Sequence, residues 1–314
     1  MDHQHGHSYV ADAMTVTVAL GDPQLEASWD RIIVADEVKE RLLNHALLSI
    51  GLRKAGVTGI GLPLHGLALL TGPPGVGKTT LARGLGSQVA RELDGRHGVV
   101  RVVDVNMHIL PSELLGRTQR NIVQLFEEEL PALAQDGPVV VVMDEVEVLA
   151  VSRSQASFDI NPADVFRGTA ALLSALDWVA REVSGSFIVG TTNMAGALDD
   201  AVLSRTDLRL DLPLPDVPVL RRIVADTLAE LGQRFPGCQA LAAAPELGDV
   251  ATLLDGIDGR QARKFVADAL ASRRETALDP SRLTAQALLE FARHARVGHA
   301  EHAVPQERAT VSVR

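Results

Sequence analysis

Hydrophobic residues along this chain fall into two kinds of segment. Short runs rich in apolar residues have the length of strands, and they lie at residues 67–70, 99–105, 139–143, 186–192 and 208–212. Between these runs, apolar residues recur at helical spacing, as at Leu81, Leu85, Val89 and Leu93. Continuously apolar strands that alternate with helices predict an α/β fold with a parallel sheet covered on both faces.

The pattern changes at residues 212–215, where the sequence reads Leu-Pro-Leu-Pro. Beyond this point the spacing predicts helices and no strand, at residues 217–231, 246–254, 259–274 and 281–296. We therefore predict a large α/β domain over residues 28–214 and a small all-helical lid domain over residues 215–296. We expect a disordered amino-terminal tail over residues 1–27 and a flexible tail over residues 297–314.

Composition narrows the classes of function. The chain has 314 residues, of which 46% are hydrophobic and 22% charged, and its formal net charge is −10. This charge argues against a nucleic-acid partner held through its phosphates. Cys238 is the single cysteine, which excludes a disulfide framework and a cysteine-based zinc site.

The sequence predicts a cytoplasmic protein without a membrane anchor. No basic segment followed by an apolar core opens the chain, and no apolar run reaches the ~18 residues that a membrane span needs. His3, His5 and His7 alternate near the amino terminus, where a disordered tail explains them better than a metal site does.

A glycine-rich motif follows the first predicted strand. Residues 72–79 read Gly-x-x-x-x-Gly-Lys-Thr and lie between that strand and a predicted helix, which is the context of a P-loop. Lys78 is expected to bind the β/γ-phosphates of ATP, and the Thr79 hydroxyl to ligate Mg²⁺. The predicted nucleotide-binding residues are Gly72, Pro73, Pro74, Gly75, Val76, Gly77, Lys78, Thr79 and Thr80.

Polar residues follow two other predicted strands. Asp144 and Glu145 end the run at residues 139–143, at the edge where open parallel sheets bind ligands. Asp144 is expected to hold Mg²⁺, and Glu145 to deprotonate the attacking water, which would distinguish hydrolysis from binding alone. Without a P-loop, the pair would equally fit solvated strand ends. Asn193, after the strand at 186–192, is a candidate to hold that water or to sense the γ-phosphate.

Arginines in two later segments are candidates to contact the nucleotide. Arg205 ends a short predicted helix and is a candidate arginine finger for a neighbouring subunit. Arg260 opens a helix of the second domain and is a candidate to bind the γ-phosphate and couple nucleotide state to domain angle, with Arg263 as second choice. Taken alone, the Arg205 segment is better explained by a surface arginine, and the Arg260 segment also fits an exposed basic helix face, which is a common feature.

The order of these motifs resembles that of AAA+ ATPases over residues 29–296. The finer resemblance is to the pachytene-checkpoint family, which includes thyroid hormone receptor interactor 13. Three segments carry it: residues 143–149 (Met-Asp-Glu-Val-Glu-Val-Leu), 204–207 (Ser-Arg-Thr-Asp) and 256–264 (Gly-Ile-Asp-Gly-Arg-Gln-Ala-Arg-Lys). The amino-terminal adaptor-binding domain of the family's eukaryotic members is not recognisable here, so we expect a bacterial type of member.

The resemblance implies an ATP-driven hexamer that unfolds part of a HORMA-domain protein through a central pore. Bacterial relatives accompany HORMA proteins and nucleotide-cyclase signalling in antiphage defence. The residues matching the family's pore loop are Leu114 and Leu115, where many AAA unfoldases carry an aromatic side chain, and Arg167 matches a second pore loop.

Three other classes of protein that also contain a P-loop are alternatives to this interpretation. A nucleic-acid machine of the clamp-loader or helicase-loader type is the main alternative, and the net charge weighs against it. A small-molecule kinase is disfavoured by the helical second domain and by the Asp144–Glu145 pair. An AAA protease is disfavoured because no His-Glu-x-x-His motif is present.

Overall fold

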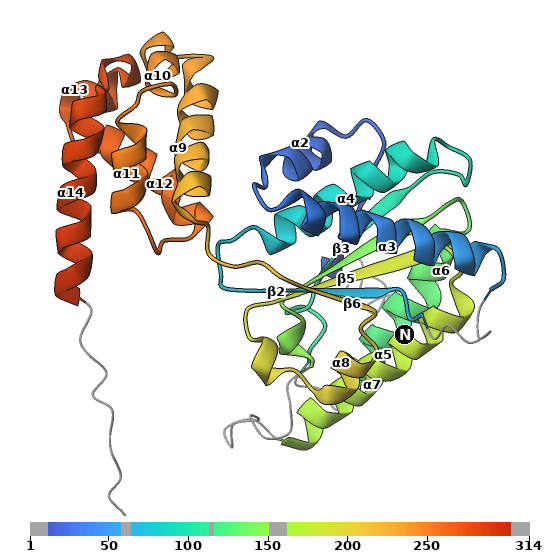
Figure 1. Cartoon of the computed structure of the whole chain (residues 1–314). Helices are drawn as coiled ribbons and strands as arrows, with labels where there is room; N and C mark the ends of the chain where they lie inside the picture. Colours follow the sequence, from blue (N-terminus) through green and yellow to red (C-terminus); the bar gives the residue numbers. More distant parts are fainter. Residues whose placement is uncertain (1–11, 58–63, 113–115, 151–161, 303–314) are drawn as a thin grey trace, which may run out of the picture. The chain divides into compact units, whose positions relative to one another are not determined.

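The computed structural model describes residues 12–57, 64–112, 116–150 and 162–302. The chain divides into two compact units, Met1–Pro213 and Leu214–Arg314, and each is described by itself (Figure 1). The division lies within the Leu-Pro-Leu-Pro segment.

The described residues of the first unit form a six-stranded sheet with the order β1-β3-β4-β5-β2-β6. The strands are β1 (Met14–Val18), β2 (Leu67–Thr71), β3 (Arg101–Asn106), β4 (Val139–Asp144), β5 (Ser186–Thr192) and β6 (Leu208–Asp211). Neighbouring strands run parallel, except that β1 is antiparallel to β3. The predicted parallel sheet is confirmed, with an antiparallel strand added at its edge.

Helices cover both faces of this sheet (Figure 1). One face packs against α2 (Pro23–Arg31), α3 (Asp36–Lys54) and α4 (Lys78–Leu93). The other packs against α5 (Arg117–Val123), the π-helical turn η1 (Gln124–Glu129), α6 (Leu130–Ala134) and α7 (Pro162–Glu182). Short elements follow β4 and β5, namely η2 (Val146–Val148), η3 (Ala195–Ala197) and α8 (Asp200–Ser204).

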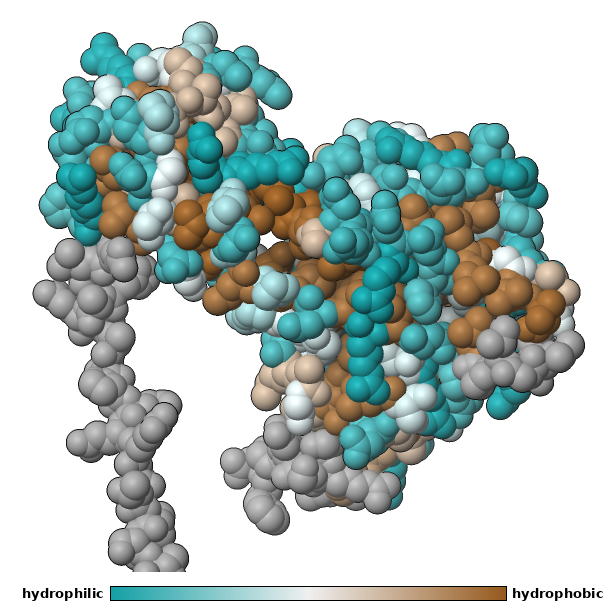
Figure 2. Space-filling view, in the orientation of Figure 1, coloured by the Kyte–Doolittle hydropathy of each residue, from teal (hydrophilic) through white to brown (hydrophobic). Residues whose placement is uncertain are grey.

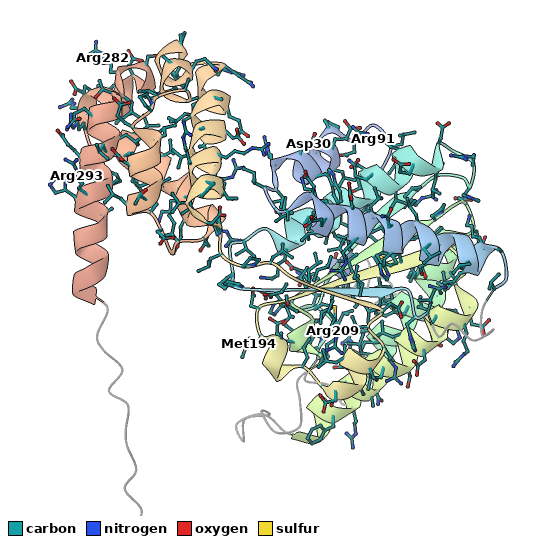
Figure 3. All side chains as sticks on the ribbon, in the orientation of Figure 1. Asp30, Arg91, Met194, Arg209, Arg282 and Arg293 are labelled. Atoms are coloured by element: carbon teal, nitrogen blue, oxygen red, sulfur yellow. The ribbon has the colours of Figure 1, made fainter. Side chains whose placement is uncertain are left out.

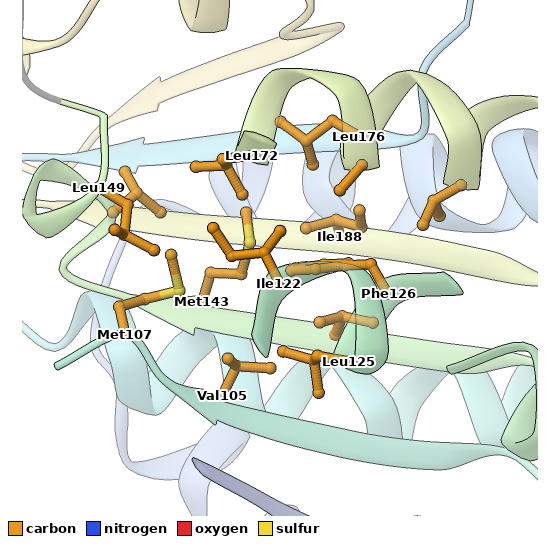
Figure 4. Close-up of a cluster of buried hydrophobic side chains, with 14 of the residues drawn as sticks. Val105, Met107, Ile122, Leu125, Phe126, Met143, Leu149, Leu172, Leu176 and Ile188 are labelled. Atoms are coloured by element: carbon orange, nitrogen blue, oxygen red, sulfur yellow. The ribbon is translucent and has the colours of Figure 1, made fainter. Parts of the chain in front are cut away.

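Strand β4 explains why the central runs are apolar at every position. Val140 and Val142 belong to the core beneath α3 and α4, whereas Val141 and Met143 belong to the core on the opposite face. Figure 4 shows this second core, in which Met143 lies among side chains of α5, η1, α7 and β5. Fully burying such an aliphatic side chain contributes about 1.5–3 kcal/mol, so both faces hold the strand in place.

The prediction of a disordered tail over residues 1–27 is wrong from residue 12 onward. β1 pairs with β3 along its whole length. Helix α2 begins after Asp22, whose carboxylate accepts the N–H groups of Gln24 and Leu25 at 2.8 and 2.9 Å. β1 was missed because an edge strand carries a weak apolar signal. Its Val16 and Val18 are 41% and 51% exposed.

The second unit is helical throughout its described residues. Its elements are α9 (Val217–Gly232), α10 (Pro236–Leu241), α11 (Leu247–Leu253), α12 (Gly259–Ala271), α13 (Arg274–Leu278), the 3₁₀ turn η4 (Pro280–Arg282) and α14 (Ala285–His302). Helix α10 was not predicted, and the helix predicted at 259–274 divides into α12 and the start of α13. Because α14 continues to His302, the flexible tail predicted over 297–314 is wrong up to that residue.

Hydrophilic residues cover much of the molecular face that Figure 2 shows, with hydrophobic patches between them. No helix in the described part of the chain is both long and apolar enough to cross a membrane.

A buried arginine ties three elements of the first unit together. Arg53 of α3 is 3% exposed. Its Nη1 donates to the backbone oxygen of Ser186 at 3.0 Å, and its Nη2 donates to the backbone oxygens of Val179 and Val183. Burial lowers the pKa of Arg53 to about 10, although nearby Asp207 opposes this effect. Arg53 thus connects α3 to the C-terminal end of α7 and to the start of β5 through hydrogen bonds.

Replacing Arg53 with methionine is expected to lower the free energy of unfolding by about 3 kcal/mol, because buried carbonyl oxygens would lose their donors. Both tryptophans, Trp29 and Trp178, lie in the first unit, so urea unfolding followed by tryptophan fluorescence measures this unit. The control is Arg91→Met, which breaks an exposed pair with Glu26 at 3.1 Å (Arg91 is labelled in Figure 3) and should cost less than about 1 kcal/mol. Equal free energies of unfolding in the two variants would contradict a stabilising role for Arg53.

Candidate active site

The P-loop connects β2 to α4 and adopts a conformation that requires glycine. Gly72, Gly75 and Gly77 have φ angles of 138°, 80° and 99°. A Cβ atom at Gly72 would lie 2.1 Å from the Leu212 oxygen, and one at Gly77 would lie 2.4 Å from Ile32 Cδ1. The backbone therefore closes into a cradle at the N-terminus of α4, where N–H groups and the helix dipole favour phosphate.

Lys78, the first residue of α4, is 6% exposed. Its Nζ donates to the backbone oxygens of Gly72 and Pro73 at 2.8 and 2.7 Å. It also donates to Asn193 Oδ1 at 2.7 Å. The ammonium group thus connects the P-loop with the loop after β5. Met194, the residue next to Asn193, marks that loop in Figure 3.

The two predicted Mg²⁺ ligands lie side by side. The Thr79 hydroxyl donates to Asp144 Oδ1 at 2.6 Å, and the Thr191 hydroxyl donates to the same oxygen at 2.5 Å. Asp144 is brought here by the sheet, since the carboxyl ends of β2, β4 and β5 share one edge. A hydroxyl and a carboxylate next to a phosphate cradle form the hard oxygen set that Mg²⁺ prefers, so these residues fit the metal.

Glu145 has an unusual backbone conformation. Its φ angle of 56° lies in the left-handed region, which a non-glycine residue adopts at a cost of about 1 kcal/mol or more. The turn directs Val146 into the core, where it packs against Gly190. It also leaves the Glu145 side chain 43% exposed at the sheet edge, accessible to the water that it is predicted to deprotonate.

Both carboxylate oxygens of Glu145 have a partner. Asn193 Nδ2 donates to Oε1 at 3.3 Å, and His108 Nε2 donates to Oε2 at 2.7 Å. Since Asn193 Oδ1 accepts from Lys78, the amide connects the lysine that is predicted to bind phosphate to the predicted general base. Lys78, Asn193, Glu145 and His108 therefore form one hydrogen-bonded series across the sheet edge.

Sequence reasoning missed three residues of this cluster. His108 follows β3, Thr191 lies at the end of β5, and Glu147 lies in η2. Glu147 Oε1 accepts the backbone N–H of Asn193 at 3.1 Å, which fixes the loop that carries the amide. Glu147 belongs to the segment 143–149 that carries the family resemblance, but the sequence alone assigns no role to its side chain. His108 and Thr191 gave no local signal.

Arg205 contacts a different set of groups. Its Nε and Nη2 donate to the two oxygens of Asp177 at 2.7 and 2.8 Å. These hydrogen bonds lower the pKa of Asp177 and raise that of Arg205. Nearby, the Asp207 carboxylate accepts the N–H groups of residues 65–67 at 2.7–3.2 Å and so fixes the chain as it enters β2.

The remaining predicted residues lie outside this cluster. Arg260 is in the first turn of α12 in the second unit, between Asp258 and Gln261, which form a capping box. Arg263 lies 3.9 Å from Glu230 in the same unit. Leu114 and Leu115, and the amino-terminal histidines, fall outside the described residues. Their roles stay predictions.

The family model described as "ATPase family associated with various cellular activities (AAA)" matches residues 68–214. CD-NTase-associated protein 6 of Pseudomonas aeruginosa is 39% identical over 277 residues, which cover 88% of this chain and 90% of that protein. The chain belongs to the AAA ATPases. It is accordingly an ATP-hydrolysing enzyme, and its P-loop unit binds nucleotide.

The AAA ATPase is also similar to pachytene checkpoint proteins, which confirms the resemblance stated from its motifs. The homolog of pachytene checkpoint protein 2 in Arabidopsis thaliana is 29% identical over 224 residues, covering 69% of the ATPase but 48% of the homolog. The ATPase thus spans about half the length of that relative. A solved structure, the E. coli MS115-1 HORMA:CdnC:Trip13 complex, shares its fold, with a TM-score of 0.71, 19% identity, and coverage of 89% and 93% of the two chains.

Proposed function

We propose that this AAA ATPase uses ATP hydrolysis to remodel a HORMA-domain protein, and that it works as a hexamer with ATP bound between subunits. One observation supports ATP hydrolysis at this site. The series Lys78–Asn193–Glu145 lies beside the Thr79–Asp144 pair at one sheet edge. A phosphate-binding cation, a polar amide and a carboxylate are thereby assembled as hydrolysis requires.

Each group has a role in the proposed reaction. Lys78 and the P-loop N–H groups bind the β/γ-phosphates. Thr79 and Asp144 would hold Mg²⁺, which when bound would supply positive charge next to the phosphates. Glu145 accepts the proton of the attacking water, and Asn193 orients that water.

Residues beyond the P-loop cluster complete the proposal. Arg205 of a neighbouring subunit stabilises charge on the transferring phosphoryl group. Arg260 transmits the nucleotide state to the helical unit, and Leu114 and Leu115 contact the protein substrate in the pore. These roles come from the motif order and the family resemblance.

The relatives support the choice of protein partner. The name of CD-NTase-associated protein 6 connects that protein with a CD-NTase, and the matched solved complex contains a HORMA protein, CdnC and Trip13. We extend this to the present chain as a HORMA-domain substrate, and as a role in antiphage signalling through nucleotide second messengers.

The proposal is tested with a purified bacterial HORMA-domain protein. Adding the HORMA-domain protein is expected to raise ATP turnover several-fold. In the presence of the ATPase and ATP, the HORMA-domain protein is expected to become more sensitive to limited proteolysis. Both effects should disappear with Glu145→Gln and with an unrelated globular protein as substrate. Single-stranded DNA serves as a second additive. Stimulation by DNA, with no effect of the HORMA-domain protein, would contradict the proposal and support a nucleic-acid machine.

A further inference from the structure

A bidentate ion pair fixes the Arg205 side chain. The residue lies at the C-terminal end of α8, and its partner Asp177 lies on α7. Arg205 Nε and Nη2 contact the two Asp177 oxygens at 2.7 and 2.8 Å, and Nη1 donates to the Ala201 oxygen at 2.9 Å. The two side chains are 23% and 32% exposed, so the pair is only partly accessible to solvent. Together these contacts select one conformation of a long side chain.

The contacts also leave a defined edge of the guanidinium available. Asp177 takes the side formed by Nε and Nη2, and Ala201 takes one N–H group of Nη1. Each terminal nitrogen carries a second N–H group, so Nη1 and Nη2 keep donors for a further acceptor. Phosphate oxygens match such a planar pair of donors.

The backbone of this segment is anchored independently of the side chain. Asp207 accepts the backbone N–H groups of His65, Gly66 and Leu67 at the start of β2. Residues 205–207 are therefore held against the sheet whatever the Arg205 side chain does. The direction of the guanidinium is set instead by its contacts with Asp177 and with the Ala201 oxygen.

We propose that Asp177 is the positioning residue for Arg205, holding the guanidinium in the conformation that reaches ATP bound by a neighbouring subunit. The proposal rests on the proposed function, in which Arg205 acts on that neighbour. Both side chains keep some contact with solvent, and the proposed effect of the pair is on the orientation of the arginine.

The first test separates kcat from KM. Asp177→Ala is expected to lower kcat about ten-fold, because a misplaced catalytic group loses its near-attack geometry, while KM for ATP stays unchanged. Asp177→Glu should recover much of this loss. The matched control is Asp136→Ala, which removes the partner of Arg101 at 2.9 Å and should leave kcat unchanged. A lower unfolding temperature with unchanged kcat in Asp177→Ala would overturn the proposal.

The second test asks which subunit is affected. Asp177→Ala subunits keep Glu145 but present a misplaced arginine, whereas Glu145→Gln subunits present a correct one. Mixed oligomers of the two are therefore expected to turn over ATP several-fold faster than the average of the separate variants. No gain on mixing would mean that Asp177→Ala damages its own site, which overturns the proposal.

The same mixing experiment with Arg205→Ala distinguishes failure of the proposed function from failure of the Asp177 proposal. If Arg205→Ala alone turns over ATP normally, the proposed function fails in its assignment of Arg205, and the Asp177 proposal fails with it. If Arg205→Ala is inactive alone and recovers on mixing, while Asp177→Ala is fully active alone, the proposed function stands and only the Asp177 proposal is wrong.

Discussion

Replacing Glu145 with glutamine is expected to lower kcat for ATP by about 100-fold or more, while ATP still binds. Glutamine keeps the size of the side chain and its acceptor toward Asn193, but it cannot take a proton from water. Its neighbours Lys78, Thr79 and Asp144 are unchanged, so the phosphate and metal contacts should persist. Steady-state phosphate release measures kcat, and titration with a fluorescent ATP analogue measures binding.

Two further variants test whether the loss of kcat is specific to the carboxylate of Glu145. Glu92→Gln, at an exposed position of α4, removes an acid of the same unit and should leave kcat unchanged. His108→Ala removes the donor 2.7 Å from Glu145 Oε2, and it should lower kcat by about ten-fold, because the base remains but is less well oriented. Normal turnover by Glu145→Gln would show that another group activates the water.

The sequence predicted the elements whose residues all lie in the same kind of environment, such as strands that are buried on both faces. Strand β4 is apolar at Val139 through Met143 because helices bury both faces of the sheet, and this pattern cannot be mistaken for a solvated strand. Edge strand β1 alternates, exposes Val16 and Val18, and lies before any recognisable element, so its signal was lost. Helix α10 has only the length of Pro236–Leu241, too short for a helical period to establish itself.

The same distinction applies to the site. Lys78, Asp144, Glu145 and Asn193 could be placed together because they end or follow parallel strands, whose carboxyl ends share an edge. His108 and Asp177 could not, since their contacts depend on how side chains from separate elements meet. Asp177 lies 28 residues before Arg205 and on a different helix, and nothing in the local sequence pairs them.

Lys78→Ala is expected to weaken ATP binding by about 100-fold or more, because a buried cation that would contact phosphate is removed. The substitution also takes donors from Gly72, Pro73 and Asn193, so the P-loop and the amide beside Glu145 both lose an anchor. If ATP binds between subunits, this variant should also fail to form the ATP-dependent oligomer. Equilibrium titration and sedimentation velocity with and without ATP measure the two effects.

Lys54→Ala is the matched control for this result. Lys54 donates to the His97 backbone oxygen at 3.0 Å, away from the P-loop, and its removal should change neither ATP affinity nor assembly. Asn193→Ala separates the two functions of the lysine, since it leaves the cradle intact but breaks the link to Glu145. It should bind ATP and assemble yet turn over slowly. Intact binding and assembly in Lys78→Ala would contradict the view that Lys78 organises the P-loop, because every contact that defines that role would then be dispensable.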